Sequence, residues 1–135
     1  MTTSSLANAS LCCAAFFGDL DAIRAHLDDG ADINGTAMNN AGEALTPLMW
    51  ASAGGRIEAM YFLLAHGASP TFTDPQTGVT ALHCAAMANQ PEAVAVLMVH
   101  GVDRCATADH NRGSELVKPI DLTRPGTAAH ALLNR

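Results

Sequence analysis

The amino-acid sequence contains three copies of one pattern, at residues 11–34, 48–70 and 82–103, which align without gaps. In each copy a leucine opens the pattern and a glycine follows nineteen residues later; these glycines are Gly30, Gly67 and Gly101. The copies begin 37 and then 34 residues apart, so the variation in length falls between copies, where loops belong. Periods of this size mark repeat architectures, because a short unit cannot bury its apolar face alone and stacks on its neighbours.

Within each copy the apolar residues follow a helical spacing. In the first copy Leu20, Ile23 and Leu27 lie at offsets of 0, 3 and 7, which mark one face of a helix. In the third copy Pro91 falls in the first helical turn, with Asn89 as a candidate cap, and each copy ends in a glycine that suits a left-handed cap. Shorter alanine-rich helices precede these, at about residues 5–17, 47–53 and 81–88. The pattern predicts an all-α solenoid of stacked helix pairs.

Composition and charge exclude several classes of partner. Apolar residues make up 49% of the chain and aromatic residues 4%, so alanine and other small side chains must do most of the packing. Seven Lys and Arg against thirteen Asp and Glu give a formal charge of −6, which argues against nucleic acid and anionic membranes as partners. The longest apolar run, residues 93–99, is far shorter than the roughly 18 residues of a spanning helix.

The cysteines and the N-terminal region indicate an intracellular protein. The four cysteines form no C-x-x-C pair, and the chain is richer in apolar residues than disulfide scaffolds are. A secretory signal needs basic residues before its apolar segment, whereas the first basic residue is Arg24. We therefore expect reduced thiols and a cytoplasmic location, with the nucleus as the alternative.

Two segments carry a motif that resembles a known family. LTPLMWASAGG at residues 45–55 and GVTALHCAA at residues 78–86 look like the Thr-Pro-Leu-His-x-Ala-Ala signature of ankyrin repeats, and GADIN at residues 30–34 resembles that family's turn. The resemblance covers about residues 5–123 and implies one domain over residues 1–135, an ankyrin-type solenoid of stacked helix-turn-helix repeats with short hairpin-like loops. The expected units are about residues 5–37, 38–73 and 74–106, with a degenerate capping unit at 107–135.

The resemblance also implies structural roles for the motif residues. In the family, the threonine hydroxyl and the histidine ring tie the hairpin to the first helix through hydrogen bonds, so we interpret Thr80 and His83 as a structural pair. Thr46 and Pro47 open the corresponding helix of the second unit, where Met49 replaces the histidine.

The pair His83 and Cys84 raises the question of catalysis. Adjacent residues on a helix do not face each other, and the slot of Cys84 holds Cys13 and Trp50 in the other units, so we interpret it as a packing position. The sequence has no phosphate-binding loop, nucleophile elbow or H-E-x-x-H helix.

Metal binding is not predicted either. His66 and His100 fall in equivalent last turns, where a histidine suits a helix C-terminus without any ligand. We predict no catalytic residue, metal or cofactor; the remote alternative is a thiol or metal-dependent enzyme that uses His83, Cys84 and Cys12.

The predicted function is binding of another protein by a monomer. The resemblance implies that loop tips and the concave face of the first helices are presented to a partner. Large apolar residues in slots that resemble exposed ones are Phe16, Phe17 and Met87, and together with Met49 and Trp50 they are candidates to line an apolar groove. Polar candidates at the loop tips are Asn39, Asn40, Glu43, Asp74, Gln76, Asn111 and Arg112.

Several alternatives stay open. The phenylalanines can instead cap the first unit against Leu6, and Trp50 can be a core residue. Turn chemistry explains the loop asparagines equally well. The alternative function is a structural or self-associating subunit of a larger assembly. Asn34 matches the turn asparagine that some repeats of the family offer to asparaginyl hydroxylases, and we treat its modification as a hypothesis.

Overall fold

The computed structural model describes residues 3–39, 42–74, 76–102, 131 and 133. Its helices are α1 (Thr3–Phe17), α2 (Leu20–Asp28), α3 (Pro47–Gly54), α4 (Ile57–Ala65), α5 (Ala81–Met87) and α6 (Pro91–Val99). Strands β1 (Ala37–Met38) and β2 (Ala44–Leu45) pair antiparallel in the loop that joins α2 to α3. In the next loop a single bridge joins Thr73 to Thr80.

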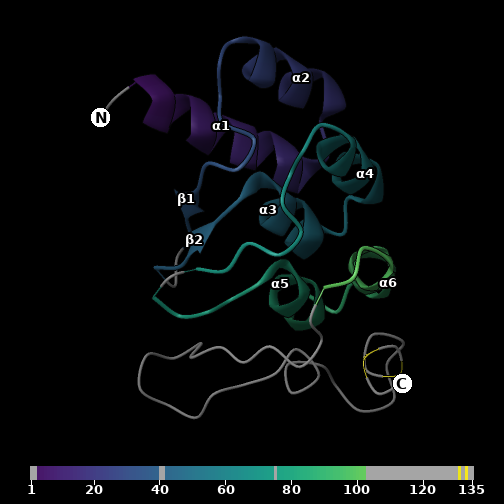
Figure 1. The fold of residues 1–135 in the computed structure, drawn as a ribbon. Helices are drawn as coiled ribbons and strands as arrows, with labels where there is room; N and C mark the ends of the chain where they lie inside the picture. The colour runs from purple at the N-terminus through teal and green to yellow at the C-terminus, as the bar shows by residue number, and fades with distance from the viewer. Residues whose placement is uncertain (1–2, 40–41, 75, 103–130, 132, 134–135) are drawn as a thin grey trace.

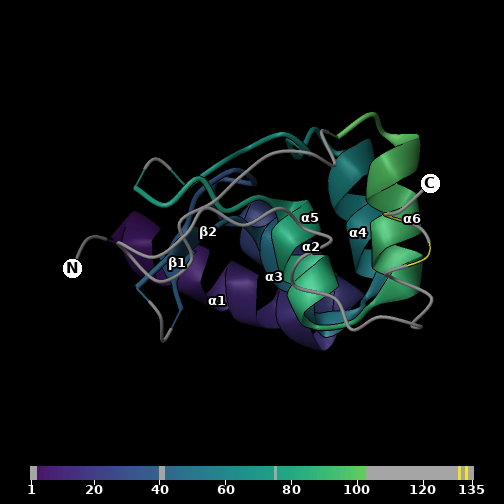
Figure 2. The ribbon, with the colours of Figure 1, turned by 90° about the horizontal axis from the view of Figure 1, so that it is seen from below.

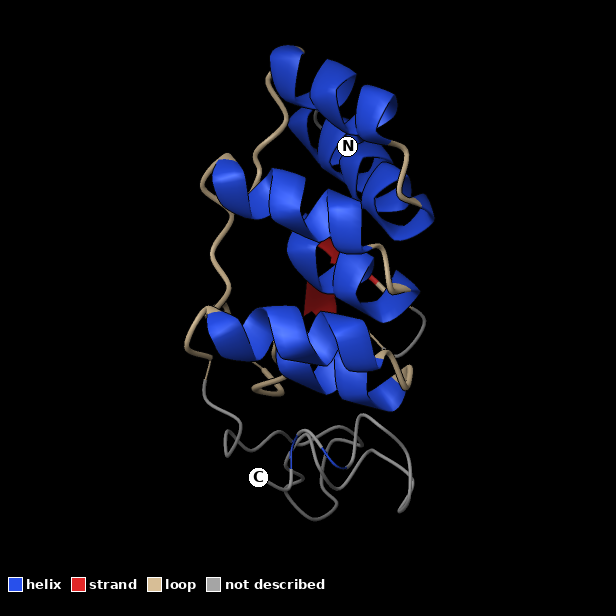
Figure 3. Ribbon diagram, turned by 90° about the vertical axis from the view of Figure 1, so that its right-hand side faces the viewer, coloured by secondary structure: helices blue, strands red, loops and turns tan. Residues whose placement is uncertain are grey.

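The helices form three pairs stacked on one another (Figure 3). One layer contains α1, α3 and α5, in which α3 packs against both neighbours, and α4 lies between α2 and α6 in the second layer. The hairpin lies beside the N-terminal half of α1, at one end of the first layer (Figures 1 and 2). The all-α solenoid of stacked helix-turn-helix repeats is confirmed within the described residues.

The tight turn between the two helices of each unit requires a left-handed residue. Gly18, Gly55 and Asn89 occupy equivalent positions and have φ values of 73°, 67° and 55°. Asparagine tolerates this conformation better than most residues with a Cβ atom. The expectation that Asn89 caps α6 is wrong, because the cap residue is Gln90, whose side chain makes no capping hydrogen bond. After the second helix, φ is again positive at Gly30, Gly67 and Gly101.

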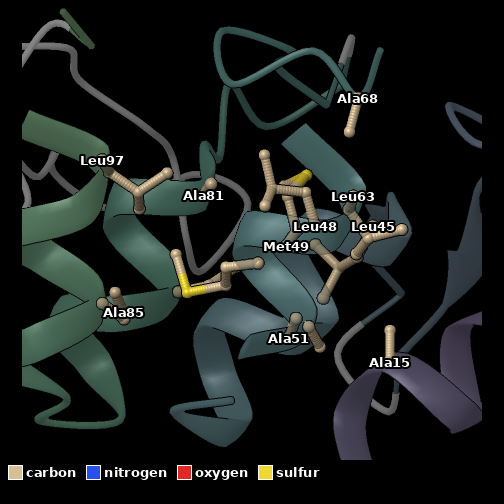
Figure 4. Close-up of a cluster of buried hydrophobic side chains, with 14 of the residues drawn as sticks. Ala15, Leu45, Leu48, Met49, Ala51, Leu63, Ala68, Ala81, Ala85 and Leu97 are labelled. Carbon is tan, nitrogen blue, oxygen red and sulfur yellow. The ribbon is translucent and has the colours of Figure 1, made fainter. Parts of the chain in front are cut away.

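The core runs without interruption through the stack. Leu11, Leu48 and Leu82, which open the three sequence copies, have no exposed surface. Burying each of these side chains contributes about 1.5–3 kcal/mol to stability. Alanines at Ala51 and Ala85 lie between the larger side chains of neighbouring helices (Figure 4), so the helices approach closely.

The first helix is longer than its counterparts. α1 has 15 residues, whereas α3 has 8 and α5 has 7, and the additional residues are at the N-terminal end of α1. In this extension Asn8 Oδ1 accepts a hydrogen bond of 2.9 Å from the Asp32 N–H of the following loop. The extension therefore has a fixed place beside the hairpin. At the other end of the stack, Leu133 is 5% exposed and joins the core, while the other residues of the predicted capping unit, apart from Ala131, lie outside the described residues.

Candidate functional site

A hydrogen-bonded pair closes the start of α5. The His83 N–H donates to Thr80 Oγ1 at 3.3 Å, the Thr80 N–H donates to His83 Nδ1 at 3.2 Å, and the hydroxyl oxygen lies 2.8 Å from the same ring nitrogen. His83 is only 1% exposed. The hydrogen bonds implied by the family resemblance are present, and they place His83 in the cap of α5.

The second unit builds the same cap with a thioether. The Met49 N–H donates to Thr46 Oγ1 at 3.3 Å, and the Thr46 N–H points to Met49 Sδ at 3.5 Å, while Pro47 occupies the first turn of α3. Met49 is 1% exposed. The prediction that Met49 contacts a partner is therefore wrong, because its side chain replaces the histidine of the cap.

An apolar groove lies between α1, β1 and α3. Its lining residues are Ala9, Cys12, Cys13, Phe16, Phe17, Ala37, Met38 and Trp50, and its volume is about 190 Å³. The lining includes no charged side chain. Phe17 and Met38 are 67% and 61% exposed, although both are large and apolar. We refer to this site as the α1 groove.

Three aromatic rings build one wall of the α1 groove. The ring centroids of Phe16 and Phe17 lie 5.3 Å apart and those of Phe16 and Trp50 lie 6.0 Å apart, both with interplanar angles of 86°. This edge-to-face arrangement is favourable beyond the area that the rings bury. Trp50 also packs against the core, and its buried Nε1 has no hydrogen-bond partner within the described part of the chain.

The helix pairs, the capped starts of α3 and α5 and the left-handed turns were compared with known protein families. A family model described as "Ankyrin repeats (3 copies)" matches residues 11–108. The chain belongs to the ankyrin-repeat family. Ankyrin repeats are, in general, protein–protein interaction modules.

Curated relatives share only a short segment with this ankyrin-repeat chain. "Ankyrin repeat and SOCS box protein 6" from Homo sapiens is 49% identical over 49 residues, which is 36% of this chain and 12% of that protein. "E3 ubiquitin-protein ligase KEG" from Arabidopsis thaliana is 50% identical over 54 residues, which is 40% of this chain and 3% of that protein. The chain thus spans a small fraction of the length of these ankyrin-repeat relatives.

Only some of the large apolar residues that were predicted to contact a partner lie together in the α1 groove. Phe16, Phe17 and Trp50 converge in the α1 groove, whereas Met87, 43% exposed at the end of α5, is not part of its lining. Trp50 is both a partly buried core contact and a groove residue. Sequence reasoning missed Met38 and its neighbour Ala37; the unusual length of the loop that contains them was the available signal.

Two of the polar loop-tip candidates are buried. Asn39 Nδ2 donates to Glu43 Oε1 and the Glu43 N–H donates to Asn39 Oδ1, both at 2.9 Å, and Glu43 is 1% exposed. Asp74, 3% exposed, accepts from Thr77 Oγ1 at 2.7 Å and from the Gln76 N–H at 3.3 Å. The predicted partner contacts of Glu43 and Asp74 are wrong, since these carboxylates fold their own loops. Asn40, Asn111 and Arg112 lie outside the described residues.

The thiols differ in exposure. Cys12 and Cys84 are 1% and 3% exposed, and the pKa of each is raised to about 12, mainly by burial and to a smaller extent by the nearby Cys13 and Glu43, respectively. A nucleophilic cysteine needs the opposite shift, because the thiolate is the reactive form. Cys13 is exposed and lines the α1 groove.

The histidines at the second-helix ends cap their own helices. His66 Nδ1 lies 2.8 Å from the Phe62 oxygen, and His100 Nδ1 lies 2.9 Å from the Val96 oxygen. Over the residues that the structure describes, no group of three or more His, Cys, Asp and Glu side chains is arranged to hold a metal ion. None of the helices described here is long and apolar enough to span a bilayer.

Proposed function

We propose that this ankyrin-repeat chain is a non-catalytic adaptor that binds another protein through the α1 groove and the adjoining loop tips. The observation that supports this function best is the exposure of Phe17 and Met38 on either side of an apolar groove. Large apolar side chains that gather at an exposed surface mark interaction sites, because covering them removes apolar surface from water, which is favourable.

Preorganisation is the proposed mechanism of binding. The units are joined by hydrogen bonds between them: Arg56 Nε donates to the Phe16 oxygen at 3.1 Å, and the Ser69 N–H donates to Asn34 Oδ1 at 2.9 Å. These bonds help hold the groove wall and the loops in place before a partner arrives. Little conformational entropy is then lost on docking, which favours affinity.

From the relatives we take only the general role of the repeats. The names of the human and Arabidopsis proteins mention a SOCS box and a ubiquitin ligase, but the matching segments are 12% and 3% of those proteins. We therefore propose no ligase activity for this chain. We also propose an intracellular monomer, supported by the free thiols of Cys12, Cys13 and Cys84.

Affinity capture from native cell extract tests the proposal. The Phe17→Asp, Met38→Asp variant places two charges in the α1 groove, and Val99→Asp is the control because Val99 is 83% exposed on α6 and outside the groove lining. Both variants are first shown to keep the wild-type helicity and melting temperature. We expect a specific protein to be retained by the wild type and the control and lost by the groove variant. Equal capture by all three chains would rule out the α1 groove as the binding site.

Self-association is tested in parallel by sedimentation over a range of concentrations. The proposal expects one species of monomer mass. A dimer that forms in the wild type and disappears in the groove variant would instead support the structural alternative.

A further inference from the structure

We infer that the α1 groove accepts one aromatic side chain from a basic segment of the partner protein. This inference rests on the proposed function and specifies the chemistry of what is bound.

The size of the groove fits one ring. Its volume is about 190 Å³. For comparison, an apolar protein cavity of about 150 Å³ binds benzene. A single phenylalanine or tyrosine side chain is therefore the largest group that the groove holds without rearrangement. Two such side chains would need a larger cavity.

The chemistry of the wall favours an aromatic group over an aliphatic one. Phe16, Phe17 and Trp50 already form successive edge-to-face pairs, and a further ring extends that arrangement. Met38 and Cys13 add sulfur atoms to the lining. Sulfur contacts with an aromatic ring edge are favourable, and a methionine adapts its shape to the group that enters.

The acidic charge of this chain indicates that the residues around the aromatic side chain of the partner are basic. The described residues include nine Asp and Glu and two basic residues, Arg24 and Arg56. The first unit contributes five exposed carboxylates: Asp19, Asp21, Asp28, Asp29 and Asp32. Such an excess attracts basic partners and disfavours acidic ones. A second copy of the chain has the same excess, so a different, basic protein is the better occupant.

The two ends of the groove differ in charge. At one end, the Asp32 N–H donates to Asn8 Oδ1, and Asn8 directly precedes Ala9 of the lining, which places a carboxylate-bearing residue beside this end. At the other end, the guanidinium of Arg56 donates to the Phe16 oxygen. A basic residue of the partner therefore belongs on the Asp32 side of the aromatic anchor, because at the other end Arg56 offsets the carboxylates of Asp19 and Glu58.

Selection from a random library of short displayed peptides tests the inference. The wild-type chain is the target, and the Phe17→Asp, Met38→Asp variant is used to remove peptides that bind elsewhere. We expect an enriched consensus with one Phe or Tyr flanked on one side by Lys or Arg. Enrichment of aliphatic or acidic sequences, or of no sequence that depends on the groove, would overturn the inference.

Affinities of one consensus peptide give the quantitative test. Replacing its aromatic residue with alanine is expected to weaken binding roughly tenfold or more, as for other interface anchors. The Asp32→Asn variant keeps a side-chain oxygen for the Asn34 N–H but loses the charge, and we expect binding to weaken roughly two- to fivefold. Asp28→Asn, at the end of α2, is the matched control and is expected to bind as the wild type does. An unchanged affinity for Asp32→Asn would contradict the assigned direction of the segment.

The two proposals fail in different ways. If the native partner is captured through the α1 groove but the peptide consensus lacks an aromatic residue or a basic one, this inference is wrong and the adaptor function stands. If the groove variant captures the same partner as the wild type, the proposed function itself is wrong.

Discussion

Arg56 Nε lies 3.1 Å from the backbone oxygen of Phe16, so a side chain that begins the second helix of one unit holds the end of the first helix of the preceding unit. Gly54 makes this approach possible. A Cβ atom at position 54 would collide with the same Phe16 oxygen.

The Gly54→Ala variant is expected to be less stable than the wild type, by up to about 2 kcal/mol. Helix propensity alone predicts a gain of up to about 1 kcal/mol for this change, but crowding in a packed interface costs about 1–3 kcal/mol. Urea unfolding followed by circular dichroism measures the difference. A gain in stability would show that Phe16 moves away without cost.

At Asn89, glycine and alanine are expected to act in opposite directions. Because φ is 55°, Asn89→Gly should leave the free energy of unfolding unchanged or slightly raised, whereas Asn89→Ala should lower it by about 1 kcal/mol. The neighbouring Ala88, with φ of −81°, provides the control: Ala88→Gly should not stabilise the chain. Thermal melts of the three variants give the comparison, and equal melting temperatures for the two Asn89 variants would contradict it.

The cap of α5 depends on the Thr80 hydroxyl. Thr80→Val keeps the shape of the side chain but removes the acceptor of the His83 N–H, so we expect a loss of about 1–2 kcal/mol. Thr80→Ser retains the hydroxyl and serves as the matched control. Chemical unfolding of both variants tests this expectation, which fails if valine is tolerated as well as serine.

The buried thiols make the stability fall at high pH. The pKa of Cys12 and of Cys84 is about 12 in the folded chain, against an ordinary value of 9.0. Above pH 9 the unfolded chain loses these protons while the folded chain keeps them. The free energy of unfolding should therefore be unaffected by these thiols below pH 9, and should fall between pH 9 and 12 by up to about 1.4 kcal/mol per pH unit for each thiol.

Unfolding of the wild type and of a Cys12→Ala, Cys84→Ala variant, on both sides of pH 9, isolates this contribution. The variant should lose less stability than the wild type as the pH rises. Parallel pH profiles would mean that the two thiols ionise in the folded chain as they do in the unfolded one.

The repeat period was sufficient to predict the fold because the units share the same local sequence signals for where helices begin and end. The positions of the helices are indicated by local signals: the equivalent leucines, the capping threonines and the glycine after each second helix. These signals do not depend on long-range contacts. Asn89 was misread because asparagine suits both a helix cap and a left-handed turn, and only the position of Gly18 and Gly55 in the other units distinguishes them.

The site was less predictable than the fold. Register in the repeat correctly brought Phe16, Phe17 and Trp50 together, but Met38 lies on a hairpin whose path the repeat pattern does not determine. Met49 shares the slot of His83, so its burial followed from the assigned structural role of that slot.

The loop carboxylates were misplaced for a different reason. Asp and Glu are mostly exposed in proteins, which made Glu43 and Asp74 reasonable surface candidates. Their burial depends on hydrogen bonds within a single turn of chain, and residue spacing gives no sign of these.

The position of α3 between α1 and α5 also affects which helix unfolds locally most often. α3 is covered on two sides, whereas α1 is packed against α3 alone within its layer. A helix packed against one neighbour in its layer opens more readily than a helix packed against two, so amide hydrogens of α1 should exchange sooner than those of α3. A partner seated in the α1 groove would contact both α1 and α3, and binding would then be recorded as slower exchange of the amide hydrogens of α1.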